Sequence, residues 1–123
     1  MSRGHGQKQR LILRALELCG PFYLAALCDG DLKTTYKAFH RAARRLENEG
    51  LLEIGAYAGG GGYGQGVQRV FVSNAKLETV TQYMPLFGAV PTWNVDRKDI
   101  KAASERVREL MANGELSVEQ SIT

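Results

Sequence analysis

A run of lysine and arginine along one predicted helix carries the clearest binding chemistry in this sequence. Residues 32–46 contain no acidic residue and five basic ones, which are Lys33, Lys37, Arg41, Arg44 and Arg45. At helical spacing the other side of the same helix is apolar, through Leu32, Phe39, Ala42, Ala43 and Leu46. A helix that packs on one side and presents only positive charge on the other fits the major groove of DNA. The alternative, a solvated charged face, usually mixes both signs of charge.

Two side chains on this face, Lys37 and Arg41, are the best candidates for contacts with base edges. Either of them can reach the O6 and N7 atoms of guanine, although contact with phosphate alone is an equal alternative. Thr34 and Thr35 stand near the start of the helix, where a hydroxyl or a backbone N–H can bond phosphate. His40 flanks the face and is a weaker candidate, because a lone flanking histidine more often has no specific role.

Net charge supports a polyanion-binding surface in the first half of the chain. The 123 residues carry a net charge of +3, but residues 1–50 hold nine Lys or Arg against five acids, while residues 51–123 hold seven against eight. The positive field therefore belongs to the first half. The length fits one domain, or one domain with an extension.

Other kinds of chemistry find little support in the sequence. The glycine-rich segment 59–66 (GGGGYGQG) lacks the Lys-Ser/Thr pair of a phosphate-binding loop, and a predicted strand follows it where that motif needs a helix. No catalytic triad, carboxylate pair or metal-ligand spacing is present, so we expect no enzyme activity, no cofactor and no metal. Cys19 and Cys28 fall on apolar faces and are expected to be buried, reduced thiols. With no apolar run of membrane-spanning length and no signal-peptide pattern, a cytoplasmic protein is expected.

The first 73 residues read as three helices followed by two strands. Residues 1–6 are expected to be a mobile basic arm. Apolar periodicity predicts a helix over residues 7–19, a short helix over 22–28 and a third helix that ends at Gly50 as a left-handed cap. The turn at residues 29–31 between the last two helices is typical of a helix-turn-helix. Strands are predicted over residues 51–58 and 67–73, with the glycine-rich loop between them.

The last fifty residues are predicted to contain two helices joined by a loop. Asn74 is expected to begin a helix that reaches residue 84, and residues 85–95 form an apolar loop that should dock onto another surface. A final helix runs from an Asp96 N-cap to residue 113. Its seam, with the loop tryptophan, is a candidate dimer contact formed by Trp93, Ile100, Ala103, Val107 and Leu110. Packing of this seam on the chain's own core is nearly as good an alternative, and residues 114–123 are expected to be a flexible tail.

This order of elements resembles the winged helix-turn-helix family of DNA-binding proteins, in its small prokaryotic or mobile-element members. The residues that carry the resemblance are 41–52 (RAARRLENEGLL), which look like the end of a recognition helix entering the first wing strand. The residues Arg3-Gly4, and Gln9-Arg10 with Ile12, Leu13 and Leu16, resemble the opening of such proteins. The match covers residues 7–73. Beyond residue 73 the sequence resembles no family.

The resemblance implies a fold and a set of contacts. It implies an α+β winged helix over residues 7–73, followed by a C-terminal helical extension over 74–113. The third helix would lie in the major groove, with Arg44 and Arg45 on phosphates, and the wing would flank it through Tyr63, Gln65 and Arg69. Family wings commonly carry a basic residue at the tip, whereas this tip has only Tyr63 and Gln65.

The expected function is sequence-specific binding of double-stranded DNA by a small homodimeric transcriptional regulator, in the manner of a repressor. DNA-binding candidates are Lys33, Thr34, Thr35, Lys37, His40, Arg41, Arg44 and Arg45. One alternative keeps the DNA contact but assigns it to partition, replication or architecture of plasmid or phage DNA. A second alternative is a winged helix used only for contact with another protein.

Overall fold

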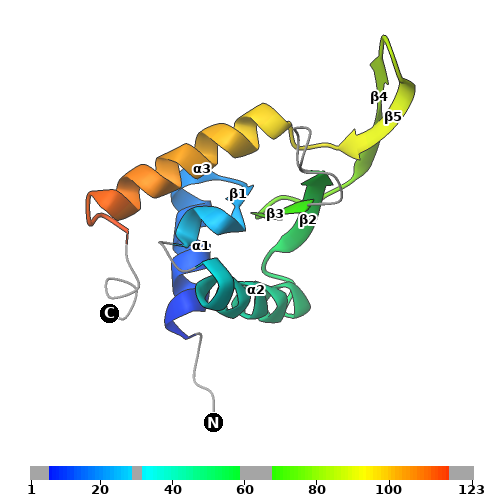
Figure 1. Cartoon of the computed structure of the whole chain (residues 1–123). Helices are drawn as coiled ribbons and strands as arrows, with labels where there is room; N and C mark the ends of the chain where they lie inside the picture. The colour runs from blue at the N-terminus through cyan, green and yellow to red at the C-terminus, as the bar shows by residue number, and fades with distance from the viewer. Residues whose placement is uncertain (1–5, 29–31, 59–67, 117–123) are drawn as a thin grey trace.

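The computed structural model describes residues 6–28, 32–58 and 68–116, and within them the fold is α+β (Figure 1). Those residues form three α-helices, one short 3₁₀ helix and two small antiparallel sheets. The order along the chain is α1 (Gln7–Cys19), β1 (Phe22–Tyr23), the 3₁₀ helix η1 (Leu24–Leu27), α2 (Leu32–Asn48), β2 (Glu53–Ala58), β3 (Gln68–Ser73), β4 (Thr79–Met84), β5 (Gly88–Trp93) and α3 (Arg97–Ala112).

The two predicted amphipathic helices of the first half are confirmed as α1 and α2. Their apolar faces meet in one core, to which η1 and α3 also contribute. Leu11 and Leu16 of α1, and Phe39 and Leu46 of α2, are almost completely buried there. The predicted helix end is also confirmed: Gly50 has a φ of 78°, and the N–H of the next residue bonds the carbonyl of Leu46 at 3.0 Å. Glycine adopts this left-handed conformation without strain.

The helix predicted over residues 22–28 is wrong. Phe22 and Tyr23 form the short strand β1, paired with Val72 and Phe71 of β3, and only the four residues of η1 coil after them. Phe22, Tyr23 and Leu24 are all buried. A segment that is buried on every side has no polar face, so helical periodicity could not distinguish it from a strand.

The first sheet has the strand order β1-β3-β2 and separates two groups of apolar side chains. The predicted strands over residues 51–58 and 67–73 are confirmed as β2 and β3. Ile54 and Val72, which are register partners, face the helical core. Tyr57 and Phe71 belong to a second apolar cluster on the other face. Gly55 makes room there, because a Cβ at this position would lie 2.7 Å from Cζ of the Phe71 ring.

The helix predicted from Asn74 to residue 84 and the loop predicted over residues 85–95 are also wrong. This segment is a hairpin of β4 and β5, in which Met84 pairs with Gly88. Phe87 N–H bonds the Met84 carbonyl at 3.1 Å, and Gly88 has a φ of 72°, as expected for a three-residue hairpin loop closed by glycine. Pro85 therefore opens a turn instead of ending a helix. We call residues 79–93 the β4–β5 ribbon; Figure 1 shows it standing clear of the rest of the molecule.

The last predicted helix is confirmed as α3, and its Asp96 carboxylate accepts a bond from the Lys98 N–H at 2.9 Å as the predicted N-cap. The proposed dimer seam is not available on its surface. Ile100, Ala103, Val107 and Leu110 are buried against the chain's own core, so packing on that core is the correct alternative. Leu116 is fully buried as well, which shows that the expected tail over 114–123 does not begin at residue 114. The C-terminal extension is therefore a ribbon and one helix.

Candidate nucleic-acid interface

The outward side of α2 carries four exposed basic side chains. Lys37, Arg41 and Arg45 follow one another at intervals of four residues, and Arg44 lies one helical turn beyond Arg41. Such spacing places them on adjoining rows of one helix surface. Among the described residues, none of these four side chains is paired with an acidic side chain, and the Arg106–Glu109 ion pair lies on α3. Their positive charge is consequently open to a partner.

The opposite side of α2 is apolar and packs into the core. Its apolar side places Phe39, Ala43 and Leu46 in the core. Lys8 of α1 adds a contact at the edge, with Nζ lying 5.9 Å from the centroid of the Phe39 ring. A cation at this distance from an aromatic ring is attracted to its face. The half-buried Lys8 thus supplies positive charge beside α2 from a different helix.

The predicted site residues with smaller or ambiguous roles lie around this face. His40 is half-buried, and its ring stacks on that of Tyr36 with centroids 5.9 Å apart. Tyr36 packs against the core, and burial, followed by the nearby Cys28, raises the pKa of its hydroxyl. Thr35 is half-buried. The side chains of Lys33 and Thr34 lie outside the described part of the chain.

The structure does not bring the predicted wing residue Arg69 to the cations of α2. Arg69 faces its register partner Tyr57, on the side of the sheet opposite the helical core, and its guanidinium carbon lies 5.8 Å from the centroid of the Tyr23 ring. Arg97, which sequence reasoning did not single out, lies 4.8 Å from the centroid of the Tyr57 ring on the same side. Tyr63 and Gln65 fall outside the described residues.

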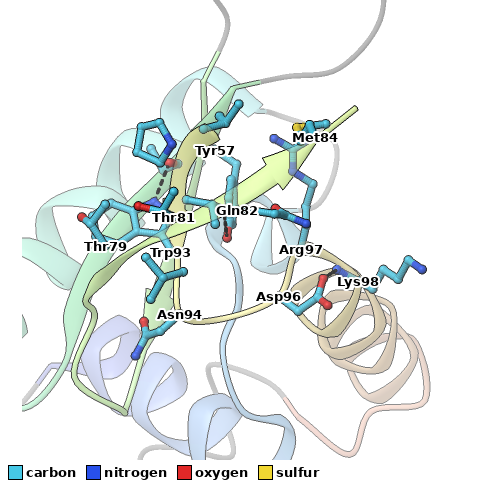
Figure 2. Close-up of a pocket in the computed structure, with 15 residues that line it drawn as sticks. Tyr57, Thr79, Thr81, Gln82, Met84, Trp93, Asn94, Asp96, Arg97 and Lys98 are labelled. Carbon is cyan, nitrogen blue, oxygen red and sulfur yellow. Dashed lines mark hydrogen bonds between the residues drawn. The ribbon is translucent and has the colours of Figure 1, made fainter. Parts of the chain in front are cut away.

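A groove of about 1,040 Å³, which sequence reasoning did not predict, runs along the ribbon from its base at Thr79 as far as Met84, between the ribbon, β2 and the start of α3 (Figure 2). Two hydrogen bonds fix its floor. The Tyr57 hydroxyl donates to the Val95 carbonyl at 2.7 Å, and the indole N–H of Trp93 donates to the Ala56 carbonyl at 2.9 Å. Arg97 and Lys98 line one end. Trp93, predicted as a dimer contact, is half-buried at this base and packs edge-on against Phe71.

Reactive groups are sparse in the described residues. Cys19 and Cys28 form no disulfide, and both are half-buried where the sequence predicted burial. Burial raises the pKa of both, and Arg106 partly offsets this for Cys19. A raised pKa keeps a thiol protonated and unreactive. The described residues contain no group of three or more His, Cys, Asp or Glu side chains placed to hold a metal ion.

No protein family, curated protein or solved structure matches this chain. Among the described residues, no helix is both long enough and apolar enough to cross a membrane.

Proposed function

We propose that this protein binds double-stranded DNA sequence-specifically, with α2 in the major groove, as a small transcriptional regulator that acts as a repressor. The observation that carries the proposal is the outward side of α2, where Lys37, Arg41, Arg44 and Arg45 are exposed and unpaired within the described residues. Phosphate contacts supply the affinity and the register of such a helix, and base-edge contacts supply its specificity. Arg41 and Lys37 are the proposed base readers.

The arrangement around α2 is compatible with a winged helix. In that reading α1 and η1 pack behind the recognition helix α2, and β2 and β3 form the wing, whose tip would be residues 59–67. The turn η1 takes the place of a regular second helix. Since Arg69 turns to the opposite side of the sheet, the affinity is proposed to come from α2 and α1 more than from the wing strands.

Two copies are proposed to act together on one site. A single recognition helix offers few base contacts, whereas a two-fold dimer reads two half-sites about one turn of DNA apart. Such a dimer requires a contact surface between the two copies, and the buried seam of α3 does not supply it.

Two other functions compete with regulation. A role in the partition, replication or architecture of plasmid or phage DNA uses the same α2 surface but coats repeated sites cooperatively. A protein-binding module is less well supported, because a protein partner rarely demands a helix face without a single acid over residues 32–46.

The test is a salt titration of binding to two duplexes: the region upstream of the protein's own gene and a scrambled duplex of the same composition. Anisotropy at several salt concentrations gives the number of phosphates contacted and the specificity ratio. A preference of ~10³ or more for the upstream duplex supports a regulator. Weak and equal binding to both duplexes favours the architectural role, and an absence of binding at low salt contradicts DNA recognition by α2.

A further inference from the structure

The β4–β5 ribbon differs from the rest of the chain in charge. Residues 79–94 (TVTQYMPLFGAVPTWN) contain no Asp, Glu, Lys, Arg or His, although 24% of the chain is Asp, Glu, Lys or Arg. Its base is fixed to the body at β2, because the Leu77 N–H donates to the Glu53 carboxylate at 2.7 Å and the Trp93 indole N–H donates to the Ala56 carbonyl at 2.9 Å. The rest of the ribbon projects from this anchored base (Figure 1).

The far half of the ribbon exposes large apolar side chains. Tyr83 is 75% exposed, Leu86 is 89% exposed and Phe87 is 72% exposed, with Met84 partly exposed beside them; Val80, nearer the base, is also partly exposed. Taking about 150–250 Å² for a large side chain and scaling it by these exposed fractions, the five side chains offer about 600 Å² per copy. Two copies together reach about 1,200 Å², the lower bound of stable specific interfaces. A lone two-stranded hairpin is also only marginally stable in water, so a partner sheet would stabilise it.

The two edges of the ribbon are not equivalent. Pro91, opposite Thr81, lies in the middle of β5 and has no N–H to contribute. The Thr81–Pro91 pair is therefore of the non-hydrogen-bonded type, which turns the backbone N–H and carbonyl of Thr81 away from β5. The same alternation turns those of Thr79 and Tyr83 outward. Strand β4 thus has an open edge with neither proline nor charge, while proline blunts the edge of β5.

We infer that the ribbon joins two copies of this chain, with β4 of one copy pairing antiparallel with β4 of the other around a two-fold axis. The result is a four-stranded sheet in the order β5-β4-β4-β5. An antiparallel arrangement brings the apolar tip of each ribbon to the base of its partner, where the groove lined by Val80, Trp93 and Arg97 opens (Figure 2). A two-fold interface is self-complementary in this way, since the same tip and groove occur on both copies.

The test measures the mass of the full chain in solution, without DNA, over a concentration series by light scattering. Thr81→Pro removes an outward N–H from the β4 edge, and Ala89→Pro, its matched control, removes one from the β5 edge without touching β4. We expect the unchanged chain to have the mass of a dimer. Thr81→Pro should raise the dimer dissociation constant about tenfold or more, because each copy loses a hydrogen bond, while Ala89→Pro leaves it unchanged. A monomer at every concentration, or equal effects of the two prolines, would overturn the inference.

A second pair of variants separates loss of the interface from loss of the fold. Leu86→Asp combined with Phe87→Asp places charge on the exposed tip, and Leu18→Asp places it on an apolar α1 side chain that is 51% exposed. The tip variant should be monomeric with an unchanged circular dichroism spectrum, and the α1 variant should remain dimeric. A tip variant that stays dimeric would refute the interface. The inference rests on the proposed function only in that two copies act together, so its failure would leave DNA binding by α2 untouched.

Discussion

Removing one arginine at a time from α2 tests whether this helix is the DNA-binding surface. Four exposed cations lie on its outward side, and each phosphate contacted changes the slope of log K against log salt by about 0.9. Arg44→Gln should therefore make the slope less steep by about 0.9 on specific and scrambled duplexes alike. Arg41→Ala should weaken specific binding by ~1–3 kcal/mol and relax the preference at one base pair. Anisotropy titrations on a panel of single-base variants of the site would measure both effects.

The matched control for these variants is Arg108→Gln, which removes the same charge from an exposed position on α3. Figure 1 places α3 on the other side of α1 from α2, so this change should leave the salt slope unaltered. Equal slope changes for Arg108→Gln and Arg44→Gln would mean that net charge, and not α2, attracts the DNA. Equal losses on every base variant for Arg41→Ala would reduce Arg41 to a phosphate contact.

Three further predictions concern the scaffold and are checked by urea unfolding. Ser104→Ala should destabilise the fold by ~1–3 kcal/mol, because the buried Ser104 hydroxyl accepts a hydrogen bond from the Tyr23 N–H at 2.7 Å and its loss leaves that donor unpaired. A decrease in the free energy of unfolding of less than a few tenths of a kcal/mol would contradict this prediction. Gly55→Ala should lower the free energy of unfolding by ~1–3 kcal/mol, because the added Cβ overlaps the buried Phe71 ring. The loss should be smaller when Phe71 is also replaced by leucine, and equal losses in the two backgrounds would show that the ring is not the cause. Burial raises the pKa of the Cys28 thiol above its unfolded value, so its contribution to stability is present below the unfolded pKa and is lost as pH rises through the folded pKa. Cys28→Ala should flatten the decline in stability above about pH 8.5, and an unchanged decline would contradict this.

The elements that sequence reasoning predicted correctly are those whose periodicity extends over several turns. In α1, α2 and α3 the buried residues recur at helical spacing, and local signals such as Asp96 and Gly50 mark where helices begin or end. The exposed cations of α2 followed from the same pattern, because residues opposite a buried stripe must face outward. What the pattern left undecided was the direction of Arg69, which depends on the register of β2 against β3.

The elements that sequence reasoning missed are short or depend on distant partners. Strand β1 consists of two residues that exist as a strand only because β3 lies beside them. A strand is indicated in β4 by the alternation of Thr79, Thr81 and Tyr83. A helix is equally compatible with the pattern, because Leu77, Val80 and Met84 fit one face of a helix. The turn Pro85–Gly88 decides between the two, since a proline followed three residues later by glycine suits a hairpin loop. Pro85 is therefore the first residue of a hairpin turn and not the end of a helix.

Helix α2 and the β4–β5 ribbon differ in charge. Residues 32–46 concentrate positive charge on α2, while residues 79–94 exclude charge altogether, and Figure 1 shows α2 and the ribbon at opposite ends of the body. Of these two regions, only α2 carries the positive charge that would attract a polyanion. Two copies joined through their ribbons would thus keep both α2 surfaces free. Because the Leu77 N–H and the Trp93 indole bond β2 and fix the base of the ribbon to the body, the ribbon would set the separation of the two α2 helices and with it the spacing of DNA half-sites.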